Sequence, residues 1–63
     1  MENPIYDKYV ELEGVVTESM LDVQKFISGN NSAGTRVRKA MQLIKGLAQE
    51  IRVEVQDQKN KQF

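Results

Sequence analysis

Apolar residues recur at helical spacing along the first half of the chain. Steps of three, four or seven residues connect Ile5, Tyr9, Leu12, Val16, Val23 and Phe26. This spacing places them on one face of an α-helix and does not fit the alternation of a strand. Asn3 suits an N-cap, and Pro4 suits the first helical turn, where its missing N–H is not needed. The pattern predicts a helix over residues 4–28.

The second half repeats the pattern more regularly, through Val37, Met41, Ile44, Ala48, Ile51 and Val55. Between the two ladders, residues 29–31 form a predicted turn, in which Gly29 suits the left-handed conformation that ends helices. Asn31 or Ser32 can cap the next helix, which is predicted over residues 32–57 and is followed by a polar, frayed tail over 58–63. Because the connection is short, the helices must be antiparallel neighbours. The expected fold is a single all-α domain, an antiparallel two-helix hairpin.

Further apolar residues make both helix faces wider than a two-stranded seam. They are Tyr6, Val10, Leu21, Ala40, Leu43 and Leu47. A wide arc indicates that each helix touches more than one neighbour. The chain has 63 residues and neither Cys nor His, so it lacks the disulfide or zinc staple that small domains usually need. We therefore expect a homodimer or higher oligomer, a helical bundle held together by the twelve ladder residues.

The formal net charge is zero, but the charges are separated along the chain. Residues 1–31 carry two basic and six acidic side chains, a net charge of −4, and residues 32–63 carry seven basic and three acidic ones, a net charge of +4. Such a split indicates an anionic partner for the basic half. The alternative is that the two helices attract each other, and the sequence leaves both interpretations open.

The densest basic cluster opens the second predicted helix. Cations at a helix N-terminus oppose the macrodipole, whereas the free N–H groups there favour phosphate. Small side chains at Ala33 and Gly34 would let a phosphate approach the backbone. The candidate phosphate-binding residues of this segment are Ser32, Gly34, Thr35, Arg36, Arg38 and Lys39. Alternatively, the cations pair with Glu18 and Asp22 on the acidic helix.

Arg38, Lys45 and Arg52 follow one another at intervals of seven residues. They form a stripe beside the apolar face of the second helix. The stripe is either a track for a nucleic-acid backbone or the ordinary flank of a bundle, where cationic stems cover apolar surface. No aromatic residue lies near the basic cluster, so stacking on bases and base-specific recognition are not expected.

Other classes of function find little support in the sequence. No nucleophile–base pair or cofactor motif is present, and the acidic residues lack the His that di-metal bundles use. We expect no enzymatic activity, cofactor, metal or small-molecule substrate. No run of about 18 apolar residues suggests a membrane span. The N-terminus does not resemble a signal peptide, and a cytoplasmic location is expected.

The segment from Gly29 to Ala40 resembles a known family. Gly29-Asn30, then Ala33-Gly34-Thr35-Arg36-Val37-Arg38-Lys39, match a motif of small bacterial histone-like proteins related to the chlamydial linker-histone-like family. The continuation Leu47-Ala48-Gln49-Glu50-Ile51-Arg52 also fits, and the resemblance covers roughly residues 23–58. The first helix resembles the family only in pattern. The long Lys/Ala-rich tail of the family is missing, as expected of a short member, whether bacterial or of viral or phage origin.

The resemblance implies DNA association and compaction of the nucleoid. Together with the basic cluster, it favours a histone-like architectural protein that binds DNA phosphates without sequence preference, as an oligomer. The candidate DNA contacts are Ser32, Gly34, Thr35, Arg36, Arg38, Lys39, Lys45 and Arg52. The alternative is a structural hairpin that oligomerises or docks on another protein and does not bind nucleic acid.

Overall fold

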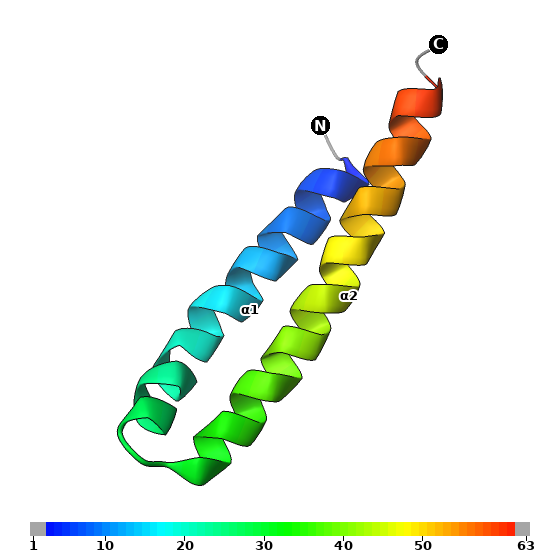
Figure 1. Cartoon of the computed structure of the whole chain (residues 1–63). Helices are drawn as coiled ribbons and strands as arrows, with labels where there is room; N and C mark the ends of the chain where they lie inside the picture. Colours follow the sequence, from blue (N-terminus) through cyan, green and yellow to red (C-terminus); the bar gives the residue numbers. More distant parts are fainter. Residues whose placement is uncertain (1–2, 62–63) are drawn as a thin grey trace.

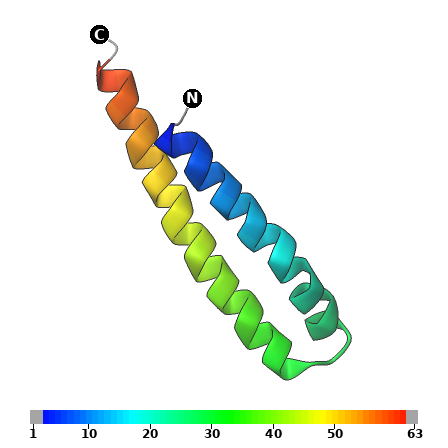
Figure 2. The ribbon, with the colours of Figure 1, turned by 180° about the vertical axis from the view of Figure 1, so that it is seen from behind.

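The protein is a hairpin of two long helices, described by a computed structural model over residues 3–61. Helix α1 spans Pro4–Ile27 and helix α2 spans Asn31–Lys61. They run antiparallel and lie side by side (Figures 1 and 2). The predicted all-α hairpin is confirmed. Neither helix is long and apolar enough to cross a membrane within the described residues.

The connection between the helices is a tight turn around Gly29. Gly29 has a φ of 108°, and its N–H donates to the carbonyl of Phe26, while the N–H of Asn30 donates to that of Lys25, each over 3.0 Å. This pair of bonds is a Schellman motif, which ends α1. The cap of α2 is Asn30 and not, as predicted, Asn31 or Ser32. The Oδ1 atom of Asn30 accepts from the N–H of Ala33 over 3.2 Å, because α2 begins one residue earlier than expected.

The open end of the hairpin is held by Asn3. Its Oδ1 atom caps α1 by accepting from the N–H of Ile5 over 2.9 Å. The amides of Asn3 and Gln58 also bond each other, over 3.2 and 3.4 Å. This contact gives α2 a partner beyond residue 57, where the sequence predicted a frayed tail. The helix continues through Lys61, and residues 62 and 63 of the predicted tail lie outside the described part of the chain.

The contact line between the helices follows a regular heptad spacing in both. Its buried or half-buried members are Ile5, Lys8, Leu12, Val15, Ser19 and Asp22 in α1, and Ala33, Val37, Ala40, Ile44, Leu47, Ile51, Glu54 and Gln58 in α2. Small residues on this line, such as Ser19 and Ala40, leave room for the helices to approach each other. The hydroxyl of the buried Ser19 donates to the carbonyl of Val16 over 3.0 Å, so its burial leaves no unpaired polar atom.

The contact line does not coincide with the two predicted apolar ladders. Seven ladder residues are buried or half-buried: Ile5, Leu12, Val23, Val37, Ile44, Ala48 and Ile51. The other five are between 38% and 58% exposed: Tyr9, Val16, Phe26, Met41 and Val55. The physical reason is that each helix has an apolar arc wider than one neighbouring helix can cover. The exposed five therefore do not form the core of a single hairpin.

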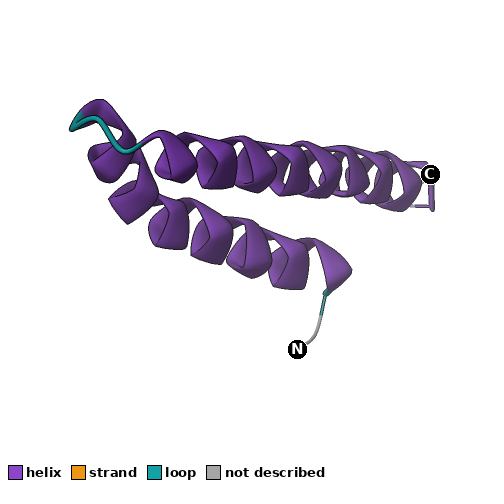
Figure 3. Ribbon diagram, turned by 90° about the horizontal axis from the view of Figure 1, so that it is seen from below, coloured by secondary structure: helices purple, strands orange, loops and turns teal. Residues whose placement is uncertain are grey.

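The described residues form one layer and not the two layers of an ordinary domain (Figure 3). The molecule measures 52 × 20 × 11 Å, and its radius of gyration is 15.1 Å, against about 11 Å for a compact domain of this length. Only Ala33, Leu47 and Ile51 are buried hydrophobic residues among those described. One layer of this kind leaves much of each helix in contact with solvent.

Candidate nucleic-acid interface

Two ion pairs connect the acidic and basic halves of the chain. Arg36 Nε lies 2.8 Å from Asp22 Oδ1 near the turn, and Lys8 Nζ lies 2.9 Å from Glu50 Oε1 near the open end. The hydrogen bond and the charge of Glu50 raise the pKa of Lys8 above its usual range. Glu54 adds a smaller effect in the same direction. The sequence left open that the basic residues pair with the acidic helix, and this alternative holds for Arg36.

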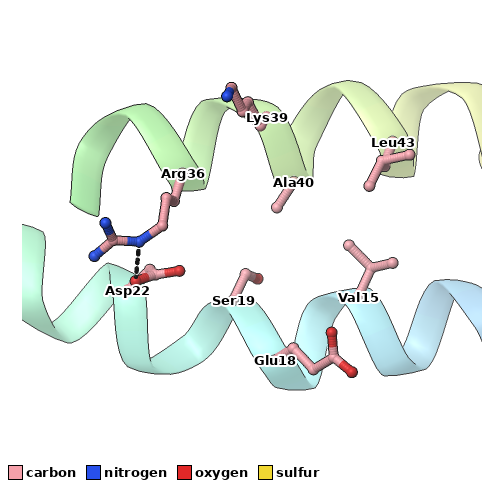
Figure 4. Close-up of a pocket in the computed structure, with 8 residues that line it drawn as sticks. All are labelled: Val15, Glu18, Ser19, Asp22, Arg36, Lys39, Ala40 and Leu43. Carbon is pink, nitrogen blue, oxygen red and sulfur yellow. Dashed lines mark hydrogen bonds and ion pairs between the residues drawn. The ribbon is translucent and has the colours of Figure 1, made fainter. Parts of the chain in front are cut away.

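Arg36 and Asp22 border a shallow depression on one side of the hairpin, which we call the ion-pair face. The depression is lined by Val15, Glu18, Ser19, Asp22, Arg36, Lys39, Ala40 and Leu43. Figure 4 shows Arg36 reaching across to Asp22, whereas Lys39 points away from α1. The lining contains two carboxylates from α1 and two cations from α2, so the depression does not favour an anionic ligand.

Unlike Arg36, the remaining cations of α2 form no ion pair with α1 within the described residues. Arg38, Lys39, Lys45, Arg52 and, near the end of the helix, Lys59 are exposed, and none of them has an ion pair within residues 3–61. No acidic residue occurs in α2 before Glu50. Of the three carboxylates that follow, Glu50 and Glu54 both act on Lys8 of α1, and Asp57 pairs with Lys61. The negative charge of Glu50 and Glu54 is therefore directed toward the other helix.

The first four of these cations surround a row of neutral polar residues on the outer side of α2. We call the whole set the cationic strip; it consists of Thr35, Arg38, Lys39, Gln42, Lys45, Gln49 and Arg52. Thr35, Arg38, Lys39 and Gln42 line one shallow groove, which shows that they share a surface. From Arg38 to Arg52 the strip extends over 14 residues, about 21 Å of helix. That length corresponds to about six base pairs of DNA at 3.4 Å each.

The small residues at the start of α2 contact other parts of the protein and do not form the predicted phosphate-binding site. Ala33 is fully buried against α1. A Cβ atom at Gly34 would lie 2.6 Å from Cδ1 of Phe26, so the space above this glycine belongs to the Phe26 ring. The hydroxyl of Ser32 donates to Asn30 Oδ1 over 2.8 Å. These residues serve the turn and the contact between the helices.

The predicted candidates therefore divide into two groups. Thr35, Arg38, Lys39, Lys45 and Arg52 share the outer side of α2, while Ser32, Gly34 and Arg36 contact the turn or α1. Sequence reasoning missed Gln42 and Gln49, which lie between the cations. Their signal was present, because Thr35, Gln42 and Gln49 are separated by seven residues each and must share a helix face.

The described residues thus form a helical hairpin with one cationic outer face. The family model of the histone H1-like protein Hc1 matches residues 6–61. This match covers nearly the whole chain, α1 included, and the chain belongs to the histone H1-like Hc1 family. Membership implies a histone-like, DNA-binding and non-enzymatic role. Comparison with curated proteins and with solved structures finds no match.

Proposed function

We propose that this protein is an architectural DNA-binding protein of the nucleoid that attaches to duplex DNA through the cationic strip, without sequence preference, and acts as an oligomer. The observation that carries the proposal is the strip itself. Four exposed cations lie on one helix face, and no carboxylate precedes Glu50 in that helix. Lys and Arg side chains that neutralise phosphates supply most of the affinity in non-specific DNA binding.

A net charge of zero is compatible with this role because of where the charges lie. Asp22 and Glu50 are engaged by Arg36 and Lys8. The other carboxylates of α1 lie on the neighbouring helix, where Glu18 borders the depression that Lys39 also lines. Surface charges further apart than about 8 Å are largely screened at physiological salt. A phosphate at the strip therefore meets mainly positive charge.

Non-specific binding is favoured by the side chains that occupy the strip. Thr and Gln can donate hydrogen bonds to phosphate and sugar oxygens, which position a protein on DNA but carry no sequence information. The strip itself contains no aromatic residue. Phe26, however, is half-exposed and lines a groove with Thr35 and Arg38, so an aromatic ring lies nearer the basic cluster than the sequence predicted; this ring packs over Gly34. DNA sequence would then matter little to the affinity of the protein.

A salt titration tests the proposal. If all four cations of one strip contact phosphates, the slope of log K against log salt is about −3.6 for duplex DNA. The variant Arg38→Gln/Lys39→Gln should reduce the slope to about −1.8 and weaken binding correspondingly. The control Lys25→Gln/Lys61→Gln removes the same charge away from the strip, since Lys61 pairs with Asp57, and should leave the slope unchanged. Equal losses in both variants, or no binding by the unmodified protein at about 50 mM salt, would refute the proposal.

One observation favours a second candidate function, a structural or protein-docking hairpin that does not bind nucleic acid. Arg36, in the centre of the basic cluster, is paired with Asp22 and not directed outward. On this hypothesis the cluster mainly stabilises the hairpin. Arg36→Ala would then lower the melting temperature, and duplex DNA would change neither the melting temperature nor the mobility of the protein.

A further inference from the structure

The hairpin exposes more surface to solvent than a compact monomeric domain of the same mass. Its accessible surface is 5258 Å², whereas a compact monomer of this mass exposes about 4,100 Å². The excess is larger than the roughly 800 Å² that each partner buries in a standard protein interface. One further partner of similar size would bring the exposed surface to the level of an ordinary domain.

The excess apolar surface gathers on the side opposite the ion-pair face, which we call the apolar face. Helix geometry places six exposed residues there, in stripes beside the contact line: Tyr9, Val16, Met20 and Ile27 in α1, and Met41 and Val55 in α2. The half-exposed Phe26 ring extends this face over Gly34 at the turn. Tyr6, Val10 and Leu21 are also exposed, but they lie on the outer side of α1 alone.

Charged residues border the apolar face differently on the two helices. On α2, Arg38 and Lys45 line a groove together with Met41, and Arg52 lines another with Val55. On α1, Glu13 lies in one heptad row with Met20 and Ile27. One edge of the face is thus basic, and the other edge carries an acidic residue.

We propose that a second copy of this chain covers the apolar face, with α1 of each copy packed antiparallel to α2 of its partner and both turns at the same end. Two face-to-face arrangements have two-fold symmetry. With the turns at opposite ends, α2 packs on α2, and the edges that carry Arg38, Lys45 and Arg52 repel each other. With the turns at the same end, each basic edge meets the edge that carries Glu13.

The ion pairs within the hairpin predict the register of this contact. In both Lys8–Glu50 and Asp22–Arg36 the residue numbers add up to 58, so residues related in this way lie at the same level. A two-fold axis parallel to the helices preserves these levels between copies. Glu13 of one copy then lies level with Lys45 of the partner copy, and opposite charges meet across the edge of the interface.

This arrangement bears on DNA, and that part rests on the proposed function. The two α2 helices lie at diagonal corners of the bundle, so their cationic strips face opposite directions. Arg38, Lys45 and Arg52 form one heptad row at the border of the strip, beside the partner, and Lys39 lies further toward the outer surface. A dimer of this kind holds two duplex segments apart and bridges them. The opposite-end arrangement would place both strips on one side, against a single duplex.

Measurements on the full chain without DNA test the dimer. Sedimentation should show a dimer that Met41→Asp converts to a monomer. The matched control Leu43→Asp lies two residues away, is similarly exposed (58% against 46%) but belongs to the ion-pair face, and should stay dimeric. A monomer at all concentrations, or equal dissociation by both variants, overturns the proposal.

Charge reversal tests the partner contact even if Met41→Asp fails to fold. Glu13→Lys and Lys45→Glu should each weaken the dimer roughly tenfold, and the double variant should restore it. Additive losses in the double variant would refute the predicted register.

Spin labels at Ser28→Cys distinguish the two arrangements. Turns at the same end place the labels within about 30 Å, because neighbouring helix axes are 8–10 Å apart. Turns at opposite ends separate them by about the length of α1, 36 Å or more, and that result would overturn the proposal. A dimer with the expected distance that fails to bind DNA would refute only the proposed function.

Discussion

The two helices of the hairpin have similar amphipathic patterns but present different surfaces to solvent. Outside the contact line, α1 shows apolar residues together with Glu11, Glu13 and Glu18, whereas α2 shows the cationic strip. Within residues 3–61, only two ion pairs cross between the helices. The charge separation along the chain is therefore larger than the hairpin needs for its own stability. On the proposed function, α1 mainly provides packing surface and α2 mainly provides the surface for DNA.

The largest expected effect contrasts two leucines of α2. Leu47 is 6% exposed on the contact line, and Leu43 is exposed on the ion-pair face. Leu47→Ala should lower the free energy of unfolding by about 2–4 kcal/mol, because it leaves a cavity between the helices. Leu43→Ala should change it by less than about 0.5 kcal/mol. Urea denaturation followed by circular dichroism measures both, and similar losses would place the core elsewhere.

The next effect contrasts the outer sides of the two helices. Gln42→Glu/Gln49→Glu introduces two carboxylates into the cationic strip and should weaken duplex binding at least roughly tenfold. Thr17→Glu/Gln24→Glu adds the same charge to the outer side of α1 and should weaken it less than about threefold, because screening limits the range of the charges. Fluorescence anisotropy with labelled duplex measures both affinities. Equal weakening would mean that net charge, and not the strip, controls binding.

Replacing a helical glycine by Ala should stabilise the protein, except where the two helices touch. Nothing lies within 4 Å of a Cβ atom at Gly14 or Gly46, so Ala at either position should stabilise the protein by about 0.8 kcal/mol through its better helix propensity. At Gly34 the added methyl meets the Phe26 ring, and the gain should disappear or reverse. Melting temperatures of the three variants check this. A stabilising Gly34→Ala would mean that the ring moves aside freely.

The smallest effect concerns the pH dependence of the Lys8–Glu50 pair. The pKa of Lys8 is raised above 10.5 in the folded protein, so the pair stabilises the fold at pH values below 10.5. This contribution is lost as the pH rises through the folded-state pKa. The Lys8→Met variant should therefore lose less stability than the unmodified protein between neutral pH and the range above 10.5. Parallel pH profiles of the two proteins would show that the ion pair contributes nothing.

Much of the fold could be read from the chain because its determinants are local. Asn3-Pro4 and Gly29 act through backbone geometry within a few residues. Both ends of α1 occur where these residues predict them. The cap of α2 was misplaced by one residue, because three adjacent residues, Asn30, Asn31 and Ser32, have suitable side chains. The extension of α2 to Lys61 was missed because its partner, Asn3, is 55 residues away from Gln58.

The candidate site was only partly predictable for a related reason. The basic cluster from Arg36 to Lys39 is visible in the sequence, but helical periodicity directs neighbouring side chains to different sides. Arg36 faces Asp22, while Arg38 and Lys39 do not contact α1 carboxylates within the described residues. Similarly, Gly34 seemed to leave room for a phosphate, until the turn placed Phe26 over it. Whether a cation of α2 is paired depends on whether α1 has a carboxylate opposite it at the same height of the hairpin.

The sequence by itself determined two amphipathic helices, the turn between them, the acidic and basic halves and the motif of the family. These properties follow from spacing and composition within single helices. Only the tertiary structure decided which part of each broad apolar arc forms the contact line, and hence that Leu47 is buried and Met41 exposed. The physical reason is that an arc wider than one neighbour permits several helix rotations. The pairing of both helices along their whole length selects one of them.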